Sequence, residues 1–339
     1  MKLRRRAAAA ATRARAPRRR TGGLFVVVAT ALLLTACDTD PAEAGDPPTT
    51  TAQMPTPPGV STGYVPTGGD DQNCDMSSLR PLSPMPDPGH MPANSSMEQI
   101  YQRGSLIVGT DIGSNPLSFR DPISGDIEGF DVDVAHWISE AIFGDPDRIE
   151  FRILATDDRL KALENGEVDV VVKSMSITCK RLQSVYFSAP YYAASQRVLA
   201  YRNSGIDSVT GLTGKSTCAT RGSTSIDRVK NMVPSVKVIS TNSWADCLVL
   251  LQQGQVDTIT SDDTILAGIA AQDPWVKMVG QSFGAEDYGV GIAKNKPDLV
   301  RFVNGVLEQR RADGSWNTSY NRWLSVLGPG SPPATTYRE

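Results

Sequence analysis

Histidine is the residue type that this sequence lacks most clearly, because only His90 and His136 occur among 339 residues. The five cysteines include no Cys-x-x-Cys pair, so the usual ligand sets of a zinc site are missing. Two histidines are also too few for us to assemble a Ser-His-Asp or Cys-His arrangement for nucleophilic catalysis. We therefore expect no metal, no cofactor and no catalytic residue.

Acidic residues are absent from the first 36 residues, which carry nine lysines and arginines and then an apolar run over residues 24–34. That run of 11 residues is too short to span a bilayer as a helix, and the layout is typical of a signal peptide. It ends in Ala36 and Cys37, the pattern of a bacterial lipoprotein box. We expect Cys37 to carry a lipid at the outer face of the cytoplasmic membrane; the alternative is an ordinary signal peptide with an incidental cysteine. Arg19 and Arg20 leave both Sec and Tat export open.

The charge of the exported part excludes a class of partner. Without residues 1–36, 25 basic residues remain against 37 acidic ones, which gives a formal net charge of −12. Phosphate backbones would repel such a domain, and no basic stripe with interleaved aromatic residues occurs. We expect no nucleic-acid partner.

Periodic apolar patterns are missing between residues 38 and 95, where 12 of the 23 prolines fall. This Pro, Thr and Gly-rich composition cannot bury enough apolar surface to fold by itself. We interpret residues 37–97 as a lipid anchor followed by a tether. Cys74 is the exception, because a spacer has no need of a cysteine.

The following 230 or so residues alternate β-branched runs with helical patterns, which is typical of an α/β fold with parallel strands. Residues 105–110 and 149–154 are predicted strands, with a helix between them. Residues 163–169 (Leu-Glu-Asn-Gly-Glu-Val-Asp) are matched by residues 251–257 (Leu-Gln-Gln-Gly-Gln-Val-Asp), and each segment ends a helix at a glycine and opens a strand. The repeat predicts two lobes of similar construction.

Open parallel sheets bind ligands beyond the carboxyl ends of their strands. In the first lobe, the strand after the repeat ends at residues 173–176. In the second lobe it ends at residues 261–263. If the two lobes face each other, these strand ends lie on opposite sides of one cleft.

Several motifs now occur in a characteristic order: residues 129–133 (Gly-Phe-Asp-Val-Asp), residues 175–178 followed by Arg181, residues 187–192, and residues 288–291. The chain resembles the family 3 solute-binding proteins, the polar amino-acid receptors of ABC importers, and among them actinobacterial glutamine-binding lipoproteins. The resemblance implies a periplasmic-binding-protein-like α/β fold of type II, with two lobes, a cleft and two hinge strands.

The resemblance also implies the extent of each part. Lobe 1 would comprise residues 98–198 plus 291–327, and lobe 2 residues 199–290. The hinge strands would lie near residues 198–201 and 288–291. Residues 328–339 would be a flexible tail.

The same resemblance assigns the ends of an amino-acid ligand. Arg181 would bind the α-carboxylate through its planar guanidinium, together with Ser223 and Thr224 at a helix N-terminus. Asp262 would bind the ammonium group, with Ser174 and Ser176 adding hydrogen-bonding groups. The alternatives are that Arg181 lies on the surface, that residues 222–225 only cap a helix, and that Asp263 caps the next one.

The side-chain pocket departs from the family pattern, because Ser114 and Thr156 stand where relatives commonly carry aromatic residues. Lys173, Arg159 and Arg221 could surround a ligand carboxylate, which favours glutamate or aspartate, with glutamine or asparagine as the other choice. Asp111 is expected in the same site. Each basic residue could instead face solvent or pair with the acidic residues 157 and 158.

Four cysteines besides Cys37 predict two disulfides in an exported chain, and three pairings are open. We favour Cys218–Cys247, on a strand and a crossover helix of one lobe, and Cys74–Cys179, which would join the end of the tether to lobe 1.

Three classes of function fit such a fold. We expect a receptor that delivers a polar L-amino acid to an ABC permease, acts as a monomer and is held at the membrane by its lipid. A sensor that signals occupancy to a membrane partner is the alternative. An enzyme such as a dehydratase, using Asp111, Asp262 or Asp263, is the least favoured, because no Glu lies at a strand end and two histidines cannot form a Ser-His-Asp triad.

Overall fold

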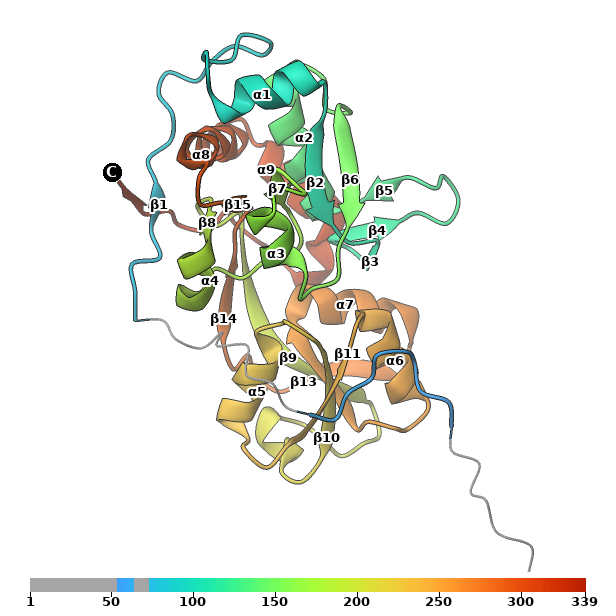
Figure 1. Cartoon of the computed structure of the whole chain (residues 1–339). Helices are drawn as coiled ribbons and strands as arrows, with labels where there is room; N and C mark the ends of the chain where they lie inside the picture. The colour runs from blue at the N-terminus through green and yellow to red at the C-terminus, as the bar shows by residue number, and fades with distance from the viewer. Residues whose placement is uncertain (1–53, 64–72) are drawn as a thin grey trace, which may run out of the picture. The chain divides into compact units, whose positions relative to one another are not determined.

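Two β-sheets organise the chain into two lobes (Figure 1). The computed structural model describes residues 54–63 and 73–339. Lobe 1 is built on a five-stranded sheet in the order β6-β2-β7-β15-β8, in which β2 runs parallel to β6 and β7 and β15 runs antiparallel to its neighbours. The strands are β2 (Leu106–Thr110), β6 (Ile149–Ile153), β7 (Val170–Val171), β8 (Val185–Phe187) and β15 (Gly291–Ala293).

Helices and a small sheet complete lobe 1. The helices are α1 (Ser96–Arg103), α2 (Phe130–Phe143), α3 (Arg159–Glu164), α4 (Cys179–Ser184), α8 (Pro297–Ala312) and α9 (Ser315–Trp323), followed by the 3-10 helix η2 (Ser325–Leu327). The small sheet consists of β3 (Gly113–Ser114), β4 (Ser118–Arg120) and β5 (Ile127–Glu128). The strands and the intervening helix that the sequence predicted around residues 105–154 are confirmed as β2, α2 and β6.

Lobe 2 is built on a six-stranded sheet in the order β11-β10-β12-β9-β13, with β14 paired to β9. Its strands are β9 (Tyr192–Tyr201), β10 (Ser216–Thr220), β11 (Lys237–Thr241), β12 (Thr258–Asp262), β13 (Val276–Val279) and β14 (Ala285–Tyr288). Its helices are α5 (Ser225–Met232), α6 (Trp244–Gln252) and α7 (Asp263–Gln272), with the 3-10 helix η1 (Val209–Leu212).

The chain passes between the lobes twice. The first passage includes the start of β9, where the ring of Tyr192 lies 5.8 Å from that of Phe130 in lobe 1 and residues 192–195 pair with β14. Residues 198–201, the expected hinge, are inside the sheet of lobe 2, where β9 pairs with β12 and β13. The second passage, between β14 and β15, lies at residues 288–291 as expected.

The internal repeat forms the same structure in both lobes. Gly166 and Gly254 follow α3 and α6 with φ of +70° and +67°, a left-handed conformation that glycine adopts without steric cost. The Asp that ends each copy accepts a hydrogen bond from the backbone N–H at the start of the neighbouring strand region: Asp169 from Ile107 at 2.9 Å, and Asp257 from Ser216 at 2.7 Å. The repeat therefore sets both the helix end and the attachment of the next strand.

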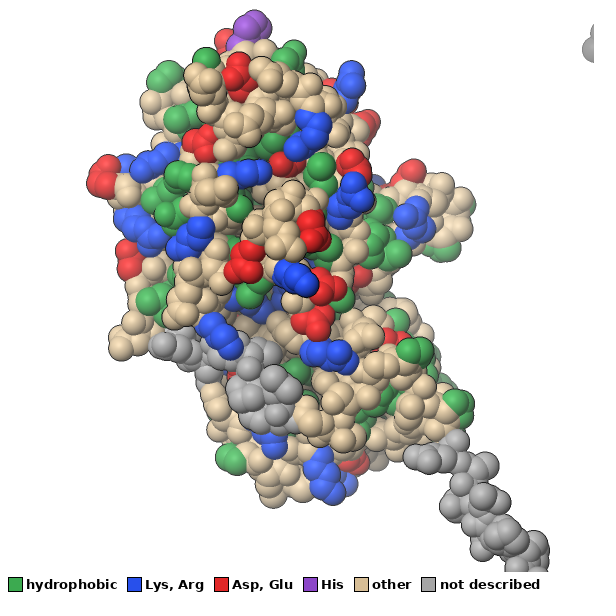
Figure 2. Space-filling model, in the orientation of Figure 1, with side chains coloured by type: hydrophobic (Ala, Val, Ile, Leu, Met, Phe, Trp, Pro, Cys, Tyr) green, Lys and Arg blue, Asp and Glu red, His purple; other side chains and the backbone are tan. Residues whose placement is uncertain are grey.

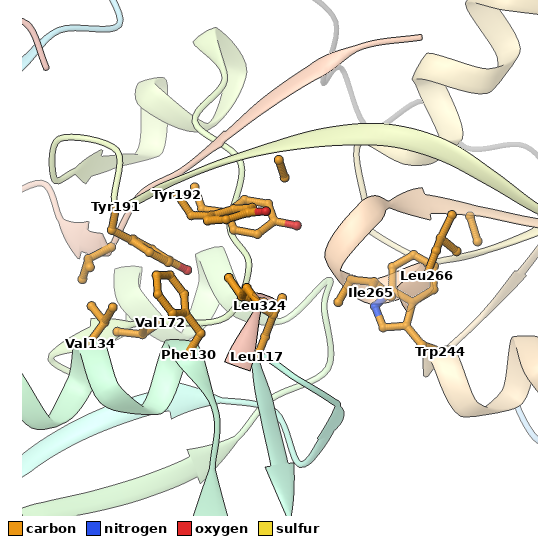
Figure 3. Packing of buried hydrophobic residues seen from close by; sticks show 14 of the residues in the cluster. Leu117, Phe130, Val134, Val172, Tyr191, Tyr192, Trp244, Ile265, Leu266 and Leu324 are labelled. Carbon is orange, nitrogen blue, oxygen red and sulfur yellow. The ribbon is translucent and has the colours of Figure 1, made fainter. Parts of the chain in front are cut away.

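Buried side chains fill both lobes up to their facing sides (Figure 3). In lobe 1, Phe130 packs its ring 6.2 Å from that of Tyr191 and 5.8 Å from that of Trp316. In lobe 2, Trp244 and Ile265 are buried at the starts of two helices. The ends of α6 and α7 that face lobe 1 are thereby fixed by packing.

The described part of the expected tether is attached to the lobes. Cys74 forms a disulfide with Cys179, and β1 (Ser78–Leu79) pairs in parallel with β16 (Tyr337–Arg338). The segment expected to be a flexible tail thus contributes a strand. The buried Asn304 donates hydrogen bonds to Ser78 Oγ and to the carbonyl of Leu79, which holds this small sheet on lobe 1.

The second disulfide joins Cys218 of β10 to Cys247 of α6, so both favoured pairings occur in the structure. Cys37 lies outside the described residues. Among the residues that the structure describes, no helix combines the length and the apolar character needed to cross a membrane.

Candidate amino-acid site between the lobes

The loop after β7 brings lobe 1 to the cleft. Ser174 has φ of +39°, and its backbone N–H donates to Asp131 Oδ2 at 2.8 Å. Asp131 also accepts a hydrogen bond from the Tyr191 hydroxyl at 2.8 Å, and its burial raises its pKa to about 6. Asp131 belongs to the motif at residues 129–133, and its role as the support of this loop was not found from the sequence.

Arg181 spans the interface between the lobes. Thr178 caps α4 and accepts a hydrogen bond from the backbone N–H of Arg181. The buried guanidinium donates to the carbonyl of Ser176 at 2.7 Å and to that of Gly222, in lobe 2, at 3.0 Å. Burial lowers its pKa. In the described part of the chain, the hydrogen bonds of this side chain go to carbonyl oxygens and not to a carboxylate.

Arg159 lies beside Arg181 at the start of α3. It is only 3% exposed and donates to the carbonyls of Thr156 at 2.8 Å and Lys173 at 3.0 Å, with a longer contact of 3.4 Å to Gly222. Burial, and then the neighbouring charge of Arg181, lower its pKa to about 9. Two buried guanidinium groups therefore share one carbonyl, and an anion between them would relieve their repulsion.

Lys173 has a different partner from the one that the sequence suggested. Its ammonium lies 2.6 Å from Asp111 Oδ2, and the ammonium end of the pair is buried. Asp111 also accepts hydrogen bonds from the backbone N–H of Ile112 and the hydroxyl of Ser114. Burial opposes ionisation of Asp111, but Lys173 and these donors outweigh it and lower its pKa. The charge of Lys173 is thus balanced within lobe 1.

Lobe 2 contributes the loop that opens α5. Gly222 has φ of +75°, and a β-carbon there would lie 2.7 Å from Asp157 Cα, so only glycine allows this close approach between the lobes. Ser223 Oγ donates to the carbonyl of Thr220, and Thr224 Oγ1 lies 3.4 Å from Ser176 Oγ across the interface. The first N–H groups of α5 provide a positive end at this point.

Asp262 ends β12 on the opposite side of the cleft from Arg181's helix. Its Oδ1 accepts a hydrogen bond from Gln196 Nε2, and its Oδ2 accepts one from the Tyr288 hydroxyl. Burial first, and then the charge of Glu286, raise its pKa to about 8. Asp263 instead accepts hydrogen bonds from Ser195 and from the N–H of Thr264, as expected for a residue at a helix start.

Arg181, Arg159 and Asp262 line one narrow cavity of about 20 Å³ between the lobes. The lining residues are Thr156, Arg159, Ser174, Ser176, Arg181, Ser223, Thr224, Ser225, Trp244, Asp262 and Ile265. Seven of the ten ligand-binding residues expected from the sequence are therefore together. Lys173 and Asp111, paired with each other, and Arg221 are not among the residues that line it.

A second cavity of about 360 Å³ shares Thr156, Arg159 and Arg181 with the first and is also lined by Arg221. The guanidinium of Arg221 donates to the carbonyl of Gly59, which precedes the lobes in sequence. Two residues that line the narrow cavity, Trp244 and Ile265, were not predicted from the sequence. Each lies at the start of a helix that follows a strand end, which is the signal that could have located them.

Comparison with known proteins gives a consistent result. The model of one family, the bacterial extracellular solute-binding proteins of family 3, matches residues 106–326. The ABC transporter glutamine-binding protein GlnH of Bacillus subtilis is 31% identical over 230 residues, covering 68% of this chain and 84% of that protein. The glutamate-binding protein GluB of Corynebacterium efficiens is 32% identical, covering 63% and 77%.

A solved structure extends the comparison. The ancestral amino acid-binding protein AncCDT-1, a precursor of cyclohexadienyl dehydratase, superposes with a TM-score of 0.63 at 31% sequence identity. The similarity covers 68% of this chain and 100% of that one.

Proposed function

We propose, since this chain belongs to family 3 of the bacterial extracellular solute-binding proteins, that it is a receptor which binds a polar L-amino acid between its lobes and delivers it to an ABC importer. The named relatives are binding proteins for glutamine and glutamate. The observation that carries the proposal is the pair formed by Arg181 and Asp262, a basic and an acidic residue from opposite lobes that line one interlobe cavity.

The two ends of an amino-acid backbone match this pair. An α-carboxylate would replace carbonyl oxygens as the partner of the Arg181 guanidinium, and charge-assisted bonds of this kind are about twice as strong as neutral ones. Ser223, Thr224 and the N-terminus of α5 lie on the same cavity and add donors. The ammonium group would meet Asp262, whose carboxylate is otherwise buried beside Glu286.

We infer that the ligand side chain is bound by Arg159 and not by Lys173. Because Lys173 is paired with Asp111, Arg159 is the basic residue in the lining of the narrow cavity that is left for a side-chain carboxylate when Arg181 binds the α-carboxylate. We therefore favour glutamate and aspartate over glutamine and asparagine. Trp244 and Ile265 offer an apolar surface to the methylene groups of such a ligand.

The receptor would work outside the cytoplasmic membrane, held by a lipid on Cys37. This assignment depends on the sequence of the leader, because Cys37 lies outside the described residues. Replacing Cys37 with serine should release the protein into the medium, whereas retention of the Cys37→Ser variant in washed membranes would contradict the anchor.

A ligand panel tests the function directly. A ligand that binds only the folded chain raises the unfolding midpoint as the logarithm of its concentration over its dissociation constant. We expect glutamate and aspartate to raise the midpoint and lysine and leucine to leave it unchanged. Recovery of each amino acid unaltered after incubation separates a receptor from a dehydratase-like enzyme.

A further inference from the structure

Residues 54–63 precede both lobes in sequence, but they are attached to the edge of the lobe 2 sheet. Ser61 and Ser240 form an antiparallel bridge: the N–H of Ser61 donates to the carbonyl of Ser240 at 2.9 Å, and the N–H of Ser240 donates back to Ser61 at 2.8 Å. Ser240 belongs to β11, which is the last strand in the order of that sheet. The segment therefore covers an edge whose backbone groups would otherwise be free to pair.

Two further contacts fix the segment around this bridge. Gln255 Nε2 lies 3.4 Å from the carbonyl of Pro55, and Arg221 donates to the carbonyl of Gly59. Gly59 has φ of +78°, and a β-carbon there would lie 2.4 Å from the side chain of Asn242. The close approach therefore requires a glycine at this position, which indicates a defined contact between the segment and lobe 2.

The attached segment forms part of a cavity wall. Ser61 and Gly63 line the cavity of about 360 Å³ that also contains Arg159 and Arg181, the two buried guanidinium groups of the candidate site. On the face of the molecule in Figure 2, acidic and basic side chains are interspersed over lobe 1. Backbone hydrogen bonds, the Arg221 contact and the packing of Val60 against the hydrophobic core attach the segment to lobe 2.

The same stretch of chain is covalently attached to the other lobe soon afterwards. Cys74 is joined to Cys179, the first residue of α4, only two positions before Arg181. Residues 54–63 thus contact lobe 2, and Cys74, later in the chain, is bonded to lobe 1. Separation of the lobes, which ligand release requires in a two-lobed receptor, changes the distance between these two attachment points.

We propose that residues 54–63 are a detachable segment, bridged to the edge of the lobe 2 sheet, that completes the wall of the cavity of about 360 Å³ adjoining the candidate site, positions Arg221 there, and slows release of the bound amino acid. The inference rests on the proposed function. It makes Ser61 and Gly59 positioning residues, which act on the ligand through the segment and through Arg221.

The test compares two substitutions at one position in the full exported chain. Ser61→Pro removes the N–H that Ser240 accepts, whereas Ser61→Ala keeps it and serves as the matched control. Dissociation of L-glutamate is followed by stopped flow through intrinsic tryptophan fluorescence, to which Trp244 in the cavity lining contributes. We expect Ser61→Pro to release glutamate about 2- to 10-fold faster, the range that follows from the net contribution of one hydrogen bond, and Ser61→Ala to behave as the parent chain.

Amide hydrogen exchange at Ser240 reports separately whether the segment has detached, and deletion of residues 54–63 removes it altogether. Loss of protection at Ser240 together with an unchanged release rate, in Ser61→Pro or in the deletion, would overturn the inference and leave the receptor function intact. Failure of the parent chain to bind glutamate, aspartate, glutamine or asparagine would instead contradict the proposed function, and the inference with it.

Discussion

Asp131 holds the backbone of Ser174, through a 2.8 Å hydrogen bond to its N–H, in a conformation with positive φ at the edge of the cleft. Its other oxygen accepts a hydrogen bond from the hydroxyl of Tyr191. Positive φ is uncommon outside glycine, and it persists where the surroundings determine it. The shape of the lobe 1 wall therefore depends on a residue 43 positions away in sequence.

Asp131→Ala should lower the free energy of unfolding and weaken amino-acid binding together. The substitution leaves two buried donors without an acceptor, at about 1–3 kcal/mol for each. Tyr191→Phe is the control, because it removes only the hydroxyl and leaves the Ser174 contact in place. Urea unfolding and calorimetry on both variants measure the effect, and an Asp131→Ala chain that binds as well as the parent would contradict the role of this support.

Lys173→Met should destabilise the fold without changing the preference between glutamate and glutamine. The reason is that Lys173 is paired with Asp111, so its loss leaves a partly buried carboxylate without its main partner. The double variant Asp111→Asn with Lys173→Met should be more stable than the sum of the single changes predicts, by about 0.5–3 kcal/mol. A switch in ligand preference on Lys173→Met would show instead that this lysine meets the ligand.

This pairing illustrates what the sequence could and could not predict. The helix stops at Gly166 and Gly254 were predictable, because a glycine after an amphipathic run is a local signal that needs no tertiary contact. Lys173 and Asp111 are separated by 62 positions, and nothing local distinguishes a paired lysine from one that faces a ligand. Family motifs predicted Arg181 and Asp262 as site residues, but they did not predict the hydrogen-bond partners of these side chains.

The positions of single residues that belong to no periodic pattern were harder to predict from the sequence. Trp244 is one aromatic residue at a helix start, and only the packing of α6 against the strand ends turns it toward the cavity. The hinge was predicted within β9, a single strand of ten residues, because its sequence does not mark where its pairing changes from β14 to β12 and β13. The attachment of residues 54–63 depends on backbone hydrogen bonds and on the packing of one side chain, Val60, which composition does not reveal.

Amino-acid affinity should rise with pH between about pH 6 and pH 8. The pKa of Asp262 is raised to about 8 by burial first and then by Glu286, above the value of about 3.9 expected in an unfolded chain. Without ligand, the Asp262 carboxyl therefore holds its proton more tightly in the folded chain than in the unfolded chain. The free energy of unfolding consequently falls as pH rises from about 4 to about 8. A ligand ammonium favours the ionised form, so binding releases the proton.

Calorimetry of glutamate binding at pH 6, 7 and 8, in buffers of different ionisation enthalpy, measures both the affinity and the proton released. The affinity should increase by up to about tenfold for each pH unit below the pKa. Asp262→Asn should lose this dependence. An affinity that is flat over the same range in the parent chain would contradict contact between Asp262 and the ammonium group.

The two disulfides should contribute unequally to stability. Cys74–Cys179 closes a sequence separation of 105 residues and Cys218–Cys247 one of 29. In the chain-entropy description these loops correspond to about 4.8 and about 3.6 kcal/mol of unfolding free energy. Paired Cys→Ser variants of each disulfide, compared by denaturant unfolding, should show the larger loss for Cys74 and Cys179, and the opposite order would contradict this account.

Arg181 and Asp262 are proposed to bind the two ends of the amino-acid backbone, which all ligands share. Calorimetry of Arg181→Ala with glutamate, aspartate, glutamine and asparagine tests it most directly, with Gln183→Ala, an exposed position of the same helix, as the control. The account predicts that Arg181→Ala loses at least about 3 kcal/mol of binding free energy for all four ligands, the scale for breaking one buried charge pair. Unchanged binding of all four by Arg181→Ala, or a loss confined to glutamate and aspartate, would contradict it.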